Sequence, residues 1–147
     1  MLETYFRDDL GLTLVRLFDR VSLNEQLEAA RRLLIEENRP RFHYPLLVDA
    51  RRMLDYPLGQ PEMMRLAARL ATVYLGQPTP LVMRVLTGQD WQRQAAQRFA
   101  ACARLVNNIA VDLFSEEKTM LAHCRKGRGT LETLFPPQCL YARYPVH

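Results

Sequence analysis

The chain has 147 residues, of which 48% are hydrophobic and 24% charged, and its formal net charge is +4. This length and composition predict one globular domain with a full core. They exclude a membrane-spanning helix, since no apolar run approaches the roughly 18 residues that a span requires. The first eleven residues, MLETYFRDDLG, are acidic where a signal peptide is basic and then apolar, so we expect a cytoplasmic protein.

The charge is distributed unevenly along the chain. Residues 1–37 hold five Arg and eight Asp or Glu, whereas residues 38–147 hold fifteen Lys or Arg and eight acidic residues. Such asymmetry can indicate nucleic-acid binding. Here the arginines are scattered among acids and glutamines, and no run of Lys or Arg exceeds two residues. We therefore do not expect a nucleic-acid partner.

The first third of the chain predicts a hairpin followed by a helix. Residues 3–6 and 12–18 are two candidate strands separated by a turn with Gly11, which favours an antiparallel hairpin. Ser22 and Glu25 have the spacing of a capping box, so a helix should begin there. It should end at residues 38–40, where Pro40 disfavours helical backbone.

The rest of the chain alternates strands and helices. Residues 46–49 are a short apolar run, typical of a central strand covered on both faces. Later strands are predicted at residues 81–86 and 109–114, and helices at 59–76, 87–108 and 116–124, the last beginning after Ser115 as a cap. The order β-β-α-β-α-β-α-β-α predicts an α/β fold with a mixed, mostly parallel five-stranded sheet and an N-terminal antiparallel hairpin.

Two segments, YPLLVDARR at residues 44–52 and VDLFSEEKTMLAHC at residues 111–124, frame this pattern. With the hairpin and the three helical crossovers, they make residues 3–124 resemble the STAS domain, the fold of bacterial anti-sigma-factor antagonists and of sulfate-transporter tails. The resemblance implies a STAS-like domain over residues 1–124 that acts by binding other proteins. Antagonists of this family carry a phosphorylatable Ser or Thr in the loop after the central strand, but residues 51–60 contain neither.

A binding edge is expected where the strands of the parallel part of the sheet end, because loops and helix N-termini converge there. Its arginines favour an anion or an acidic partner. The alternatives are capped, solvated helix starts and a small-molecule pocket. The candidate residues are Arg51, Arg52, Asp55, Tyr56, Gln89 and Trp91.

No pattern of residues indicates a reaction. His43, His123 and His147 are isolated, so no metal site is expected. Cys139 would need a base that the sequence does not identify. Neither a dinucleotide-binding motif nor a P-loop is present, and no cofactor is expected.

The final residues, 125–147, predict an apolar docking extension. After the polar residues 125–130, six large apolar or aromatic residues occur within fourteen positions, too many for a disordered tail. We expect them to pack on the chain's own sheet, on a second subunit in a homodimer, or on a partner, along an extended path set by two prolines. They are Leu131, Leu134, Phe135, Leu140, Tyr141 and Tyr144.

Taken together, the sequence favours a non-enzymatic cytoplasmic module for protein interaction or regulation, without the phosphorylation switch of the family that it resembles. The alternative is a small-ligand binder or an enzyme that uses the strand-end edge.

Overall fold

The computed structural model describes residues 1–124, 130–135 and 142–143. Its elements are, in chain order, β1 (Leu2–Arg7), β2 (Leu12–Arg20), α1 (Leu23–Leu33), the 3-10 helix η1 (Glu36–Arg41), β3 (Leu46–Asp55), α2 (Gln60–Val73), β4 (Leu81–Leu86), α3 (Asp90–Leu105), β5 (Ile109–Phe114), α4 (Glu117–His123), α5 (Leu131–Leu134) and β6 (Ala142–Arg143). The predicted α/β fold class is confirmed. η1, α5 and the two-residue β6 are additional to the predicted elements.

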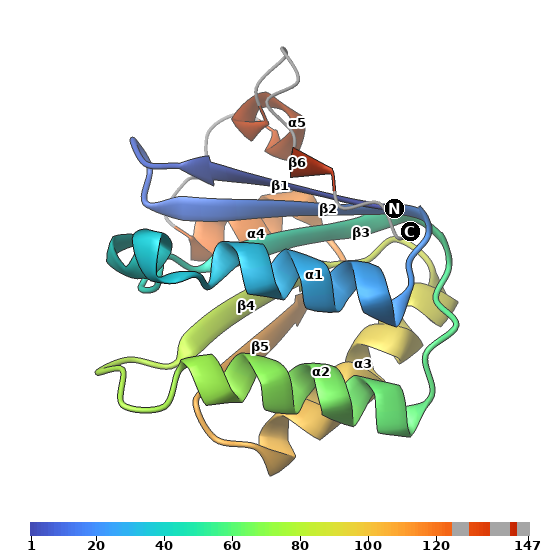
Figure 1. The fold of residues 1–147 in the computed structure, drawn as a ribbon. Helices are drawn as coiled ribbons and strands as arrows, with labels where there is room; N and C mark the ends of the chain where they lie inside the picture. Colours follow the sequence, from blue (N-terminus) through green and yellow to red (C-terminus); the bar gives the residue numbers. More distant parts are fainter. Residues whose placement is uncertain (125–129, 136–141, 144–147) are drawn as a thin grey trace.

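The strands lie side by side in the order β5-β4-β3-β2-β1-β6 (Figure 1). β1 pairs antiparallel with β2 and with β6, and the pairs from β2 to β5 are parallel. Every crossover steps to the next strand in the same direction, so right-handed connections place α1, α2 and α3 on one face. Because the strand order never reverses, this part of the sheet has no switch-point crevice of the kind that holds ligands in doubly wound folds.

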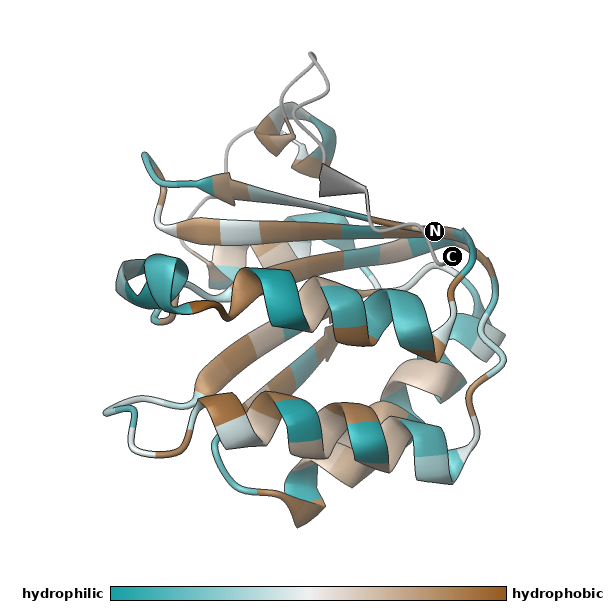
Figure 2. Cartoon of the chain, in the orientation of Figure 1, coloured by the Kyte–Doolittle hydropathy of each residue, from teal (hydrophilic) through white to brown (hydrophobic). Residues whose placement is uncertain are grey.

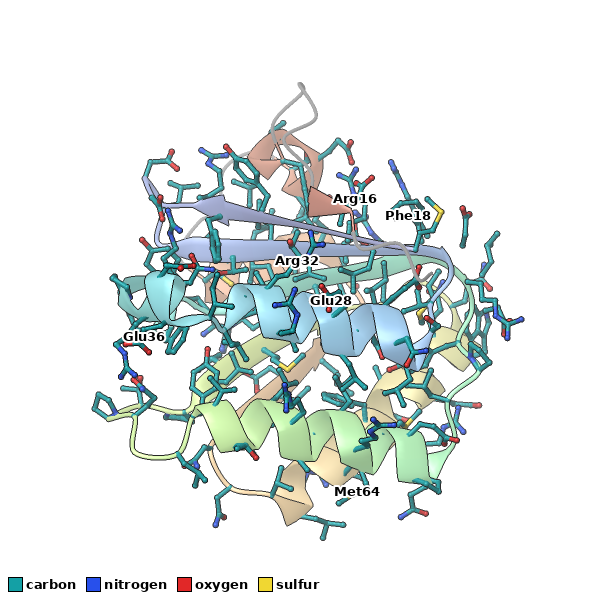
Figure 3. All side chains as sticks on the ribbon, viewed as in Figure 1. Arg16, Phe18, Glu28, Arg32, Glu36 and Met64 are labelled. Carbon is teal, nitrogen blue, oxygen red and sulfur yellow. The ribbon has the colours of Figure 1, made fainter. Side chains whose placement is uncertain are left out.

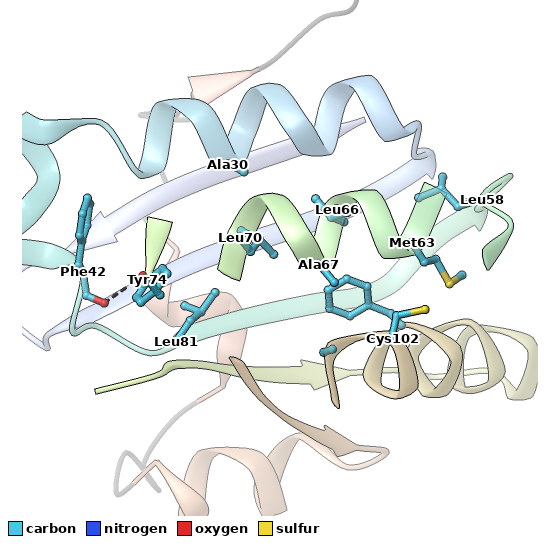
Figure 4. Packing of buried hydrophobic residues seen from close by; sticks show 12 residues of the cluster. Ala30, Phe42, Leu58, Met63, Leu66, Ala67, Leu70, Tyr74, Leu81 and Cys102 are labelled. Carbon is cyan, nitrogen blue, oxygen red and sulfur yellow. Dashed lines mark hydrogen bonds between the residues drawn. The ribbon is translucent and has the colours of Figure 1, made fainter. Parts of the chain in front are cut away.

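The face covered by α1, α2 and α3 holds most of the core. Tyr74, at the end of α2, is 2% exposed, and its hydroxyl donates a hydrogen bond to the Phe42 carbonyl oxygen at 3.0 Å (Figure 4). This bond satisfies the one polar atom of a large buried ring. The buried side chains of this cluster are Ala30, Phe42, Leu58, Met63, Leu66, Ala67, Leu70, Tyr74, Leu81, Phe99, Cys102 and Ala103.

The opposite face of the sheet packs against α4 and α5. Side chains alternate along β2, so that Leu14 points to this face while Val15 points toward the α1–α3 layer. The second-face cluster joins strand residues to the two short helices, and its buried members are Leu12, Leu14, Leu47, Leu86, Met120, Leu121, Leu131 and Phe135. The sheet is therefore covered on both sides, as the apolar run in the third strand predicts.

The sequence predicts serine caps at the starts of two helices, and the structure confirms one of them and contradicts the other. The backbone N–H of Glu25 donates to Ser22 Oγ at 3.2 Å, and the N–H of Ser22 donates to Glu25 Oε2 at 3.0 Å, which confirms the capping box. α2 begins after Gly59 with Pro61 in its first turn, as expected. Ser115 does not cap α4, because the helix begins one residue later and its N-cap is Glu116.

Candidate functional site

The strand that leads to the predicted edge, β3, is longer than the sequence suggests. β3 does not stop at Asp49 but continues to Asp55, so Arg51, Arg52 and Asp55 belong to a strand and not to a loop. The extra length pairs with the end of β2, with irregular register there. Asp19 of β2 has φ 55°, a left-handed conformation that accompanies such bulges. The link between β3 and α2 is accordingly only four residues long.

The charged side chains of this edge are paired within the chain. Arg51 donates to both carboxylate oxygens of Asp49 at 3.0 Å, and its Nη2 lies 3.6 Å from Glu117 Oε1. The hydrogen-bonded Asp49 carboxylate raises the pKa of Arg51. Arg52 Nη2 lies 3.5 Å from Glu132 Oε2. The positive charge expected to attract an acidic partner is therefore largely balanced by α4, α5 and the sheet itself.

Asp55 and the three uncharged edge residues also have partners. Asp55 lies 3.5 Å from Arg20 in an exposed ion pair. The hydroxyl of Tyr56 donates to Gln26 Oε1 of α1 at 3.1 Å, and burial raises the pKa of Tyr56 to about 12. Trp91 Nε1 donates to Gln89 Oε1 at 2.8 Å. Each of the six candidate edge residues therefore forms a hydrogen bond or an ion pair within the chain.

Gln92 is an important edge residue that the sequence analysis missed. Its Oε1 accepts from the backbone N–H groups of Gly88 and Gln89, both at 2.9 Å. Its Nε2 donates to the carbonyl oxygens of Arg51 and Met53 at 3.0 and 2.9 Å. One buried amide thus ties the first turn of α3 to the end of β3. The signal was its position, three residues after the N-cap Gln89, where glutamine often closes a capping box.

The C-terminal segment packs on the second face of the sheet through residues 130–135. Leu131 is 0% and Phe135 is 3% exposed, and the guanidinium carbon of Arg16 lies 4.1 Å from the Phe135 ring centroid. The backbone N–H of Leu131 donates to Glu117 Oε1 at 2.7 Å. Leu134 is half-buried beside the same cluster. The path begins as the short helix α5 and not as extended chain. Leu140, Tyr141, Tyr144 and the candidate nucleophile Cys139 lie outside the described residues.

A groove that the sequence analysis did not anticipate runs between α1 and α2. It has a volume of about 500 Å³. Figure 2 shows hydrophilic turns on the outward sides of both helices, and Figure 3 shows Glu28 and Arg32 on the outward side of α1. The residues that line it are Asn24, Leu27, Glu28, Arg31, Arg65, Ala68, Arg69 and Thr72.

The charges of this α1–α2 groove are unequal on its two walls. On α1, Arg31 and Arg32 both donate to Glu28, at 2.8 to 3.0 Å, and these hydrogen bonds lower the Glu28 pKa to about 2. On α2, Arg65 and Arg69 are exposed and one helical turn apart. Within residues 1–124, 130–135 and 142–143, neither has an ion-pair partner. The α2 wall thus presents uncompensated positive charge.

Among the described residues, no group of three His, Cys, Asp or Glu side chains is arranged to hold a metal ion. In that same part of the chain, no helix has the length and apolar character needed to cross a membrane. Comparisons of the chain with protein-family models, with curated proteins and with solved structures gave no match. No similar protein therefore assigns a role to the edge or to the groove.

Proposed function

We propose that this chain is a non-enzymatic, cytoplasmic interaction module that binds an acidic, amphipathic segment of a partner protein in the α1–α2 groove. The observation that carries the proposal is the pair of exposed arginines, Arg65 and Arg69, on the α2 wall without an ion-pair partner in the described residues. Arginine is well suited to this role, because its planar guanidinium binds carboxylates through two parallel hydrogen bonds.

The groove also has an apolar part. Leu27 of α1 and Ala68 of α2 line it between the charged walls, and Leu27 packs at the margin of the core. An amphipathic helix could place apolar side chains on these residues and carboxylates against Arg65 and Arg69, which is the helix-in-groove mode of recognition. α1 and α2 have 11 and 14 residues, so the groove can hold about three to four turns of a partner helix.

The same features favour a protein over a nucleic acid. Glu28 lies in the groove and stays ionised far below neutral pH, so it repels carboxylates and phosphates alike and does not distinguish the two kinds of partner; the apolar part of the groove does. The Thr72 hydroxyl donates to the Ala68 carbonyl oxygen at 2.8 Å and is engaged within α2. The apolar strip of Leu27 and Ala68 adds nothing to phosphate binding, whereas a partner helix with both leucines and glutamates can contact the strip and the arginines.

The STAS resemblance is part of the proposal and rests on the order of the elements. A hairpin followed by three parallel crossovers is the arrangement that the resemblance implies, and it is compatible with a regulatory binding domain. The link after β3, residues 56–59, contains no Ser or Thr. We therefore propose that partner binding is not controlled by serine or threonine phosphorylation at that position.

Charge reversal on α2 tests the proposed groove. The probe is a synthetic amphipathic helical peptide of leucine, glutamate and alanine, labelled for fluorescence anisotropy. Arg65→Glu with Arg69→Glu should weaken its binding about tenfold or more, because two attractive contacts become repulsive. The matched control is Arg93→Glu with Arg104→Glu, which makes the same charge change at exposed positions of α3.

The outcomes separate a site from a general charge effect. The control pair should retain most of the affinity, and Glu28→Gln should increase it by removing a like charge. Equal losses in both double variants would show that the peptide responds only to net charge. Stronger binding of a DNA duplex than of the peptide, lost in the α2 variant, would replace the proposal with nucleic-acid binding.

A further inference from the structure

The outer side of β5 is open to a further strand. β5 ends the sheet on this side, and within residues 1–124, 130–135 and 142–143 no strand lies beyond it (Figure 1). Its six residues, IAVDLF, contain neither Gly nor Pro, and they pair with β4 without a shift in register. Proteins often protect an edge strand with a proline, a bulge or a cover, because a regular edge strand can pair with another chain. β5 has no proline and no bulge, so its backbone is regular enough for such pairing.

The bonds to β4 show which backbone groups of β5 face outward. The carbonyl oxygens of Asn108, just before β5, and of Phe114, its last residue, accept backbone hydrogen bonds from the start and from just beyond the end of β4, at 2.8 and 3.0 Å. Backbone groups of successive strand residues point alternately to the two sides, so every second residue from 108 to 114 faces β4. The N–H and C=O groups of Ile109, Val111 and Leu113 therefore point away from β4.

The side chains of β5 differ on its two faces. Ile109, Val111 and Leu113 are half-buried and pack at the margin of the core beneath the α1–α3 layer. On the opposite face of the sheet, Ala110 and Asp112 are exposed. The residues whose backbone groups point outward are thus the apolar ones. A second strand placed beside β5 would extend this apolar row and would meet one carboxylate and one small side chain on the other face.

We propose that β5 pairs antiparallel with β5 of a second copy of this chain, about a two-fold axis through Val111. Val111 then lies opposite Val111 of the second copy, and Ile109 lies opposite Leu113 of the second copy. Each of these pairs exchanges both N–H···O bonds, so that all the outward backbone groups of the strand find partners. Main-chain hydrogen bonds supply affinity in strand addition, and apolar cross-strand pairs add to it. The proposal is independent of the α1–α2 groove, since it concerns different residues.

The strand is complementary to itself in this one register. Asp112 lies opposite Ala110 of the second copy, so the carboxylate meets a small, uncharged side chain. A shift of two residues in one direction would place Asp112 directly opposite Asp112 of the second copy, and like charges in that position destabilise a sheet. The same shift in the other direction would place Leu113 opposite residue 107, outside the strand. A two-fold contact uses the same patch on both copies, which is why self-complementarity favours a second copy as the occupant.

The test measures the oligomeric state of the full chain by sedimentation velocity over a range of concentrations, and we expect a reversible dimer. Ala110→Asp places an acid opposite Asp112 on both sides of the axis and should raise the dimer dissociation constant about tenfold or more. Ala68→Asp makes the same change at an exposed position of α2 and should leave that constant unchanged. Adding Asp112→Lys to Ala110→Asp places opposite charges across the axis again and should restore the dimer.

Three results would overturn the proposal. They are a monomer at every concentration, a dimer that Ala110→Asp does not weaken, and a folded double variant that stays as weak as Ala110→Asp alone. The second result would place the dimer contact elsewhere on the chain. Circular dichroism checks that each variant is folded. Should Ala110→Asp fail to fold, Ala110→Lys takes its place, because its charge attracts Asp112 of the second copy and should tighten the dimer; an unchanged or weaker dimer would then contradict the proposal.

Discussion

The phenolic hydroxyl of Tyr56, just after β3, donates to Gln26 Oε1 in the middle of α1, and the two oxygens lie 3.1 Å apart. α2 begins at Gln60, four residues after Tyr56, so this bond fixes the start of α2 against α1. Gln26 thus faces Tyr56, whereas its neighbours Leu27 and Glu28 line the α1–α2 groove. Successive residues of α1 therefore differ in their surroundings: Gln26 holds the link after β3, and its neighbours form a wall of the groove.

Gln92 should be among the most sensitive polar positions in the domain. Gln92→Leu removes four hydrogen bonds and leaves buried backbone groups without partners. Each such bond contributes about 0.5–1.5 kcal/mol, so we expect the free energy of unfolding to fall by about 2–4 kcal/mol. Chemical denaturation measures it. Gln94→Leu, exposed on the same helix, should change stability by no more than about 0.5 kcal/mol. Equal effects would contradict the assigned role of Gln92.

The packing of α5 on the chain's own sheet can be tested with two leucines. Leu131→Ala creates a cavity in the second-face cluster and should lower the free energy of unfolding by about 2–5 kcal/mol. Leu105→Ala, at a position 72% exposed, should have little effect. A change at Leu131 no larger than that at Leu105, in a protein of unchanged size by light scattering, would show that α5 does not contribute to this core.

Two serines offer a matched test of helix capping. Ser22→Ala removes the side-chain oxygen that accepts from the Glu25 N–H and should cost about 0.5–2 kcal/mol of stability. Ser115→Ala removes a hydroxyl that caps no helix and should be nearly neutral. A larger loss at Ser115 than at Ser22 would mean that the start of α4 differs from the one described.

Two tyrosines should make the protein sensitive to alkali. Burial raises the pKa of Tyr56 and of Tyr74 from 10.0 to about 12. Between these values the unfolded chain loses the phenolic protons while the folded chain keeps them. Stability from these groups is therefore complete below about pH 10 and declines as the pH rises toward about 12. Absorbance titration near 295 nm should show at least two late-ionising tyrosines, and Tyr56→Phe should remove one. Ionisation of both near pH 10 in the folded protein would contradict the assignment.

Much of the fold was predictable because its signals are local. The capping box at Ser22, the Gly59 and Pro61 pair and the apolar run from Leu46 each specify an element boundary or a buried strand. The length of β3 was not predictable in this way. Its last residues, Arg51 to Asp55, show no alternation of apolar and polar side chains, and what makes them a strand is pairing with the end of β2, more than thirty residues earlier. Pairing at that distance leaves no local pattern.

The sites were less predictable than the fold. Arg65 and Arg69 have the spacing of one helix face, but their approach to Arg31 depends on how α1 packs beside α2. Arg51 and Arg52 were expected in the loop after the third strand but lie within β3, and their partners Glu117 and Glu132 come from the far end of the chain.

The most direct test of the central claim is NMR mapping of the acidic helical peptide on the isotopically labelled chain. The account predicts that amide shifts on titration concentrate in α1 and α2, around Leu27, Glu28, Arg65 and Arg69, with α3, α4 and the end of β3 little changed. Shifts centred instead on Arg51 and Arg52, or spread evenly over all basic residues, would contradict the assignment of the α1–α2 groove as the partner-binding site.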